Sequence, residues 1–217
     1  MKSATAVPQT KTSTPATRNP RRTRERILAA AVREFSDKGL AGARVDVIAR
    51  RARVNKRMLY HYFGSKDDLF SAVLVHKVAQ REALLSSAPE EPSQTLNYWF
   101  DAACRDPDWF RLLGWEALQR PHRALVHEKH RREVSRQALE QIQQRQARGF
   151  LPAGLDPRHL LLTMMAITTF PLALPQTTRL VTGHSVLDPK FRQERKTFLT
   201  QFAKLLRVAV RDRGTRA

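Results

Sequence analysis

The feature that most constrains the fold is the recurrence of apolar residues at helical spacing, which begins at Thr23. Ile27, Ala31 and Phe35 recur every four residues and therefore share one face of a helix. No stretch alternates apolar and polar residues as a half-buried strand does, and we find no internal repeat. The sequence therefore predicts an all-α protein. Helices are expected at residues 23–39, 45–52, 55–63, 66–86, 93–104, 107–118, 124–148, 157–170 and from 189 onward.

Two of these helices, at 45–52 and 55–63, are short and are separated by a brief turn at Arg53 and Val54. With the longer helix before them they match the layout of a helix-turn-helix motif. The second helix of such a pair lies in the major groove of DNA, because its width matches that groove. The pattern therefore predicts a DNA-binding unit over residues 23–66.

The helix predicted at 55–63 separates its apolar and polar side chains. Leu59 and Phe63 fall one turn apart and are expected to face the core. The opposite face and its flanks carry Arg57, Met58, His61, Tyr60 and Tyr62. Central side chains on such a face can reach base edges, while flanking hydroxyls donate to phosphates. Lys66, at the start of the next helix, is expected to bind a phosphate together with the helix N-terminal amides.

The distribution of charge agrees with a localised surface for a polyanion. Thirty-nine Lys and Arg against twenty Asp and Glu give a net charge of +19. Residues 1–66 alone hold sixteen basic and four acidic side chains, a net charge of +12. A charge that served solubility alone would have no reason to be so uneven, whereas a surface for a polyanion, such as nucleic acid, anionic lipid or an acidic protein, would.

The single cysteine, Cys104, excludes a disulfide within the chain and a metal cage built from cysteines alone. It fits a reducing compartment. Residues 1–22 lack the apolar core of a secretory signal. We therefore expect a cytoplasmic protein.

Residues Thr23–Leu74 resemble the N-terminal domain of the TetR/AcrR family of transcriptional regulators. The resemblance rests on three stretches in the family's order and spacing: T-R-E-R-I-L-A-A-A-V-R-E-F-S-D-K-G-L, V-D-V-I-A-R-R-A-R-V and L-Y-H-Y-F-G-S-K-D-D-L-F. It implies that DNA is contacted by the start of the reading helix, by its middle and by the following lysine. The matching residues are Asn55, Lys56, Arg57, Met58, Tyr60, His61, Tyr62 and Lys66.

Four positions depart from the family's pattern. Arg44 stands where a threonine often bonds phosphate, and its charge can serve the same purpose. Arg53 replaces the turn glycine, so we expect a turn conformation that a side chain tolerates. Arg57 and Met58 replace the usual glycine and small residue, respectively, so the operator sequence stays open. Arg57 suits guanine O6 and N7, and Met58 suits a thymine methyl group.

For residues 67–217 the resemblance implies a helical domain that binds a small-molecule ligand and forms a homodimer. The helix at 157–170 is apolar nearly all round, which predicts burial on more than one side. A two-fold dimer would place two reading helices about 34 Å apart, or a multiple of that distance, on a palindromic operator in double-stranded DNA. The apolar residues expected to line a ligand cavity, unless they are plain core, are Trp99, Phe100, Cys104, Trp109, Phe110, Trp115, Met164 and Met165. Arg111, His122 and Arg123 are candidates for an anionic group, although a solvated face is the simpler placement.

Residues 1–22 are rich in Ser, Thr, Pro and Ala and are expected to form a disordered basic arm. Arg18, Arg21 and Arg22 either reach the adjacent minor groove or remain a solvated tail. Composition alone leaves both open.

The sequence gives little support to a membrane span, a metal site or an enzyme. His159–Thr178 matches a membrane span in length, but its five threonines and two prolines favour a buried helix and a turn. His127 and His130 are one residue too close for the H-E-x-x-H zinc motif, and we expect no metal and no cofactor. No catalytic motif is evident, so an enzyme is not expected. The remaining alternative to a ligand-responsive repressor is an architectural DNA-binding protein that responds to no ligand.

Overall fold

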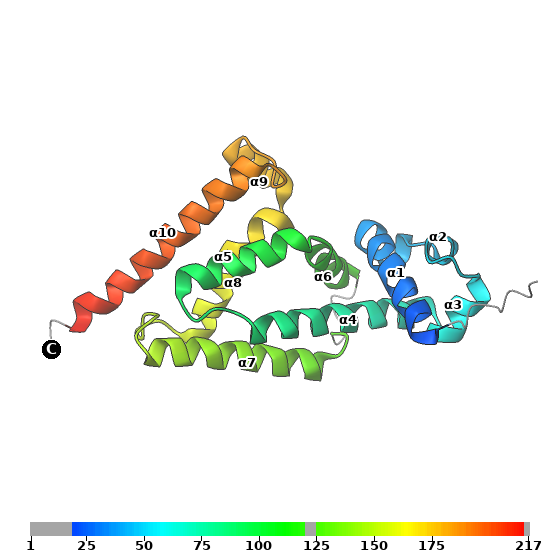
Figure 1. Ribbon diagram of the computed structural model, residues 1–217, viewed down its shortest axis with the longest axis horizontal. Helices are drawn as coiled ribbons and strands as arrows, with labels where there is room; N and C mark the ends of the chain where they lie inside the picture. Colours follow the sequence, from blue (N-terminus) through cyan, green and yellow to red (C-terminus); the bar gives the residue numbers. More distant parts are fainter. Residues whose placement is uncertain (1–18, 120–124, 215–217) are drawn as a thin grey trace, which may run out of the picture.

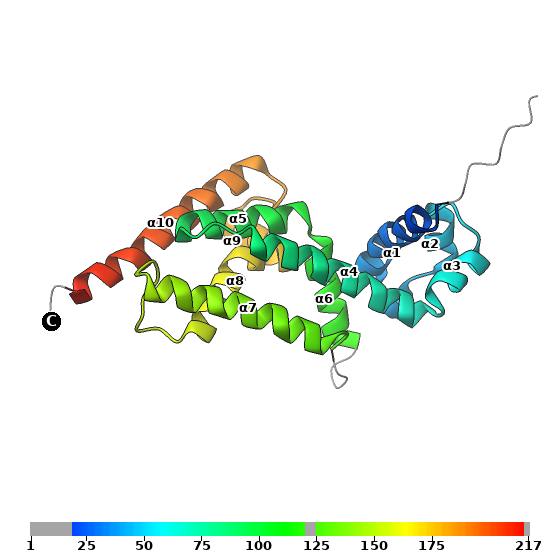
Figure 2. The same ribbon diagram turned by 60° about the horizontal axis from the view of Figure 1, so that its bottom comes forward.

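The computed structural model describes residues 19–119 and 125–214, with side chains as far as Leu206. These residues form ten α-helices and no β-strand, as the sequence predicts. Figures 1 and 2 show α1 to α3 gathered at one end of the molecule, and α4 running from them into a larger helical unit. The helices are α1 Pro20–Gly42, α2 Val45–Arg51, α3 Lys56–Phe63, α4 Lys66–Ser86, α5 Pro92–Arg105, α6 Asp108–Gln119, α7 Glu128–Ala147, α8 Pro157–Ala173, α9 Pro175–Thr182 and α10 Pro189–Gly214.

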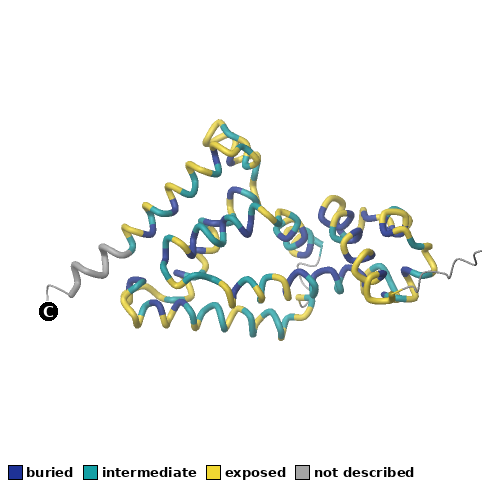
Figure 3. Tube along the Cα trace, in the orientation of Figure 1, coloured by how far each residue is buried: buried dark blue, intermediate teal, exposed yellow. Residues whose placement is uncertain are grey.

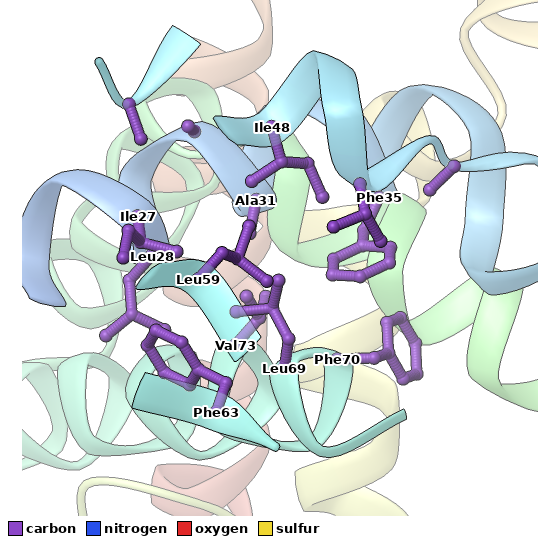
Figure 4. Close-up of a cluster of buried hydrophobic side chains, with 14 of the residues drawn as sticks. Ile27, Leu28, Ala31, Phe35, Ile48, Leu59, Phe63, Leu69, Phe70 and Val73 are labelled. Atoms are coloured by element: carbon purple, nitrogen blue, oxygen red, sulfur yellow. The ribbon is translucent and has the colours of Figure 1, made fainter. Parts of the chain in front are cut away.

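The first four helices share one apolar core (Figure 4). Phe35 of α1 and Phe70 of α4 meet edge to face, with ring centroids 5.1 Å apart. The buried carboxylate of Glu34 ties α1 to the second helix, because it accepts from the Arg51 guanidinium at 2.9 Å and from the Arg44 amide at 3.3 Å. The labelled side chains that fill this core are Ile27, Leu28, Ala31, Phe35, Ile48, Leu59, Phe63, Leu69, Phe70 and Val73.

The turn between α2 and α3 is a Schellman motif. The Val54 amide donates to the Ala49 carbonyl at 3.0 Å, and the Arg53 amide donates to the Arg50 carbonyl at 3.1 Å. This pattern requires a left-handed residue directly after the helix cap, and Arg53 has φ 53°. The expectation of a conformation that suits a side chain is therefore wrong. Arg53 adopts the backbone conformation that usually belongs to glycine.

Both ends of α1 differ from the prediction. The helix begins at Pro20 rather than Thr23, because the Asn19 side chain accepts from the Arg22 amide and proline suits the first helical position. Arg21 and Arg22 therefore belong to the helix and not to a disordered arm, while Arg18 lies outside the described residues. Gly39, the predicted stop, has φ 66° and kinks the helix, which resumes as far as Gly42.

A second apolar core lies between α5, α7, α8 and α10, and includes Leu96, Phe100, Ile142 and Leu199. Within the single chain only one face of α8 is buried, so the predicted burial of its other sides stays a prediction that depends on a partner. A separate short helix, α9, follows α8 at an angle of 89°, where the sequence predicted only a turn. Among the described helices no single one meets the length and hydropathy of a membrane span, although the bent pair of α8 and α9 does so jointly.

Candidate nucleic-acid interface and cavity

Helix α3 is oriented as its periodicity predicts. Leu59 is fully buried and Phe63 nearly so, whereas Lys56, Arg57 and His61 are exposed. Tyr60 is 38% exposed, and Met58 and Tyr62 are half-buried. One side of this two-turn helix is thus anchored in the core, and the other carries cationic and hydrogen-bonding groups that point away from the protein.

Three side chains on or beside the exposed face of α3 already make contacts within the protein. The Asn55 side chain caps α3 by accepting from the Met58 amide at 2.7 Å, so its oxygen holds the helix start. The rings of His61 and Tyr62 pack edge to face, with centroids 5.8 Å apart. This contact limits the rotamers of both side chains on the outer face of α3.

Arg44 precedes α2 and is exposed, but its guanidinium is bound to Asp46. Its Nε and Nη2 donate to the two carboxylate oxygens at 3.3 and 3.2 Å. Hydrogen bonding to Arg44 lowers the pKa of Asp46, so the carboxylate remains charged at neutral pH. A phosphate that used Arg44 would have to compete with this carboxylate.

Lys66 is also engaged within the protein. Its ammonium donates to the Ala41 carbonyl at 3.1 Å, which leaves two of its three N–H groups for a phosphate. At the start of α4, the Ser65 hydroxyl accepts from the Asp68 amide, and the Asp68 carboxylate accepts from the Ser65 amide. This capping box uses one of the helix N-terminal amides that the sequence assigned to phosphate binding.

A cavity of about 400 Å³ lies among α4, α5, α6, α7 and α8. Its lining includes five of the expected residues, namely Trp99, Trp109, Phe110, Met164 and Met165.

Three other expected residues lie elsewhere. Phe100 is fully buried in the second core, and Cys104 packs against the same core. Trp115 points toward α1, where its Nε1 donates to the Ser36 carbonyl at 3.1 Å. Helical periodicity predicts that these apolar side chains are buried, but it does not specify which other helix they contact. Of the three candidates for an anion, Arg111 pairs with Asp37 on the surface at 3.2 Å, and His122 and Arg123 lie outside the described residues.

The charged residues of the cavity are the ones that the sequence reasoning missed: Arg81, Arg131 and Arg145 line it. A signal was present, because Arg81 occupies the same helical face as Val78 and Leu85, at spacings of three and four residues. A charged residue inside an apolar stripe indicates a buried polar environment.

Among residues 19–119 and 125–206, no cluster of three or more His, Cys, Asp or Glu side chains is placed to hold a metal ion. His130 instead contacts the Glu82 carboxylate, with Nε2 and Oε2 3.2 Å apart. Burial raises the pKa of the Cys104 thiol, which disfavours the reactive thiolate.

A helix-turn-helix with an exposed, cationic second helix, joined by a long helix to a helical unit with a cavity, defines a class of DNA-binding transcriptional regulator. The comparisons with known proteins specify the family. Residues 27–73 match the family model of bacterial regulatory proteins of the tetR family, and residues 97–204 match the tetracyclin repressor-like C-terminal domain. The chain belongs to the TetR family of transcriptional regulators and is not an enzyme.

Individual relatives agree with this assignment. The HTH-type transcriptional repressor SCO4008 of Streptomyces coelicolor is 33% identical over 168 residues, which cover 77% of this chain and 88% of the relative. The repressor NicS of Pseudomonas putida is 41% identical over 104 residues, which cover 45% of this chain and 49% of NicS. The crystal structure of the putative regulator SCO4942 from Streptomyces coelicolor superposes with a TM-score of 0.66 at 28% identity, over 84% of this chain and 96% of that one.

Proposed function

We propose that this protein is a homodimeric, cytoplasmic repressor that binds a palindromic operator and is released from it by a small-molecule ligand. The observation that carries the proposal is the orientation of α3, with Leu59 and Phe63 held in the core and Arg57 and His61 exposed. A helix held in this way can enter the major groove without losing its packing. The relatives named as repressors support the direction of regulation.

Each exposed group has a role in this proposal. Arg57 reads guanine and Met58 contacts a thymine methyl group, which together set sequence preference. The hydroxyls of Tyr60 and Tyr62 donate to phosphates on either wall of the groove. The other DNA contacts are Arg44, Asn55, Lys56, His61 and Lys66. Of these, Arg44 and Lys66 replace part of their hydrogen bonding to Asp46 and to the Ala41 carbonyl with hydrogen bonds to phosphate.

Apolar side chains exposed on α8, α9 and α10 support the homodimer. Leu180 and Val181 on α9 are 83% and 80% exposed, and Leu187 just before α10 is 72% exposed. Figure 3 shows exposed positions on α9 and recurring along α10. The further members of this set are Leu162, Met165, Phe170, Leu174, Phe198 and Leu205. A surface with so many large apolar side chains indicates an interface, and a two-fold partner would cover both copies at once.

Two helices can carry a signal from the cavity to the DNA-binding unit. Helix α4 contributes Val73 to the core of that unit and Val78 to the cavity lining. Helix α6 lines the cavity with Phe110 and holds α1 through Trp115 and Gln119. The Gln119 side-chain oxygen accepts from the Leu40 amide at 2.9 Å.

The Trp115 ring also lies directly against Gly39, where a Cβ atom would be 2.7 Å from two of the ring carbons. Such a close contact transmits displacement. A ligand that prefers one placement of these helices shifts the spacing of the two reading helices. A tenfold change in operator occupancy requires about 1.4 kcal/mol of differential affinity.

Selection of bound sites from a random DNA library tests this proposal, because it returns the half-site, its symmetry and its spacing together. We expect a palindrome and a preference of about 10³ or more over random DNA. A set of selected sites without symmetry, or with a weaker preference, would favour the architectural alternative.

Two variants then separate reading from anchoring. Arg57→Ala should relax discrimination at one base pair and cost about 1–3 kcal/mol there. Tyr60→Phe removes a phosphate donor and should weaken binding to the operator and to random DNA by the same factor. An equal loss on both DNAs for Arg57→Ala would contradict its base-reading role.

A further inference from the structure

We propose that the cavity binds an amphipathic organic carboxylate, whose anionic group contacts Arg81 and whose apolar body contacts the surrounding aromatic and aliphatic side chains. The proposal rests on the assignment of this cavity as the ligand site and adds the chemical class of the ligand.

The first observation is the state of the Arg81 side chain. Its guanidinium lies over the rings of Trp99 and Phe110, with the central carbon 5.3 and 5.6 Å from the ring centroids. Its Nη1 is buried and has no hydrogen-bond partner among the residues that the structure describes. Burial lowers the pKa of Arg81, but a guanidinium remains protonated in proteins. The result is a half-buried cation that lies against two rings and lines the cavity, with an Nη1 amino group that has no acceptor among the described residues.

The second observation is the charge balance of the cavity. Its lining contains three arginines and, within the described part of the chain, no aspartate, glutamate or histidine. Arg131 is neutralised, because its Nη1 donates to both carboxylate oxygens of Glu116 at 3.0 and 2.7 Å. Arg145 donates from Nη2 to the Pro89 carbonyl at 2.9 Å, a neutral acceptor. The carboxylates of Asp106 and Glu90 act on Arg81 and Arg145 from outside the lining, but they are paired with Lys77 and Arg148. Among the described residues, the lining therefore holds two guanidinium groups without an ion-paired carboxylate, and an anionic ligand can supply one.

The third observation is the shape and lining of the space around Arg81. The volume of about 400 Å³ lies within the range of pockets for small organic molecules. Most of the lining is apolar, including Trp109, Leu113, Val134 and Met164. An inorganic anion would leave these surfaces against water or empty space, whereas an aromatic or aliphatic body would fill them. A single carboxylate matches the planar fork of one guanidinium.

The test compares ligands that share a skeleton and differ in charge. 2-Naphthoate and decanoate, each with its primary amide and its primary amine, are titrated into the full-length protein by isothermal titration calorimetry. At least one carboxylate should bind about tenfold or more tighter than its amide, because a hydrogen bond to a charged group contributes more than a neutral one. The amines should bind weakest. This comparison needs no variant and so does not depend on how a mutant folds.

Variants then locate the effect. Arg81→Gln should remove the preference for carboxylate over amide, and Arg81→Lys should keep part of it. Arg105→Gln is the matched control, because Arg105 is exposed and does not line the cavity. Circular dichroism and the midpoint of thermal unfolding confirm that each variant is folded.

The proposal is overturned if neither carboxylate binds, if the amides bind as tightly, or if Arg81→Gln keeps the preference. Its failure can be told apart from failure of the proposed function. If an uncharged compound released operator DNA equally well from the wild-type protein and from Arg81→Gln, the ligand class would be refuted and the repressor mechanism would still be supported. Carboxylate binding through Arg81 without any change in operator affinity would support the ligand class and refute ligand-controlled release.

Discussion

Replacing Arg53 with glycine should stabilise the protein. Arg53 has φ 53° because the Schellman motif after α2 needs a left-handed residue there. For a residue with a Cβ atom this conformation destabilises the folded state by about 1–2 kcal/mol. Glycine avoids that strain, but its greater freedom in the unfolded chain lowers the stability of the variant by about 0.5–1 kcal/mol. The net gain for Arg53→Gly is therefore about 0.5–1 kcal/mol in the free energy of unfolding.

Arg53→Ala is the matched control, because it removes the same charge and keeps the strained backbone. Urea unfolding followed by circular dichroism, at one protein concentration for all variants, measures the free energy of unfolding. We expect glycine above alanine, with Arg53→Asn between them, since asparagine tolerates the left-handed region. A glycine variant no more stable than the alanine variant would refute the strain argument.

Further predictions concern other parts of the chain. Asp46→Asn removes the carboxylate that holds Arg44, so affinity for operator and random DNA should rise together in filter binding; an unchanged affinity would contradict a phosphate role for Arg44. Leu180→Glu places a charge on the proposed interface and should yield monomers in sedimentation velocity, whereas persistence of the dimer would show that α9 lies outside the interface. Gln119→Ala removes the acceptor of the Leu40 amide and should reduce the ligand's effect on DNA binding more than its binding to the cavity, as calorimetry and DNA titration together would reveal. Burial raises the pKa of Cys104, so its reaction with Ellman's reagent at pH 8 should be slower in the folded protein than in urea, and equal rates would contradict that burial.

The sequence by itself determined the local structure and the DNA-binding unit. Helix periodicity, capping residues and breaks at glycine and proline are signals carried by neighbouring residues, so they placed nearly all of the helices. The same locality fixed the orientation of α3, because Leu59 and Phe63 lie one turn apart and only one face of an eight-residue helix can meet the core. Local signals were less decisive at the turn, where Arg53 takes a glycine conformation because the backbone bonds on either side require it.

Only the tertiary structure decided what each apolar or charged side chain meets. Trp99 and Trp115 are equally aromatic in the sequence, yet one lines the cavity and the other contacts α1, since helices distant in the chain supply the opposite surface. Arg81 is one of many arginines in a basic chain. Its significance comes from the rings of Trp99 and Phe110, which other helices place against its guanidinium, and from the lack of an acceptor for its Nη1 among the described residues. Periodicity records which side of a helix is buried, whereas the partner of that side depends on packing between segments far apart in the sequence.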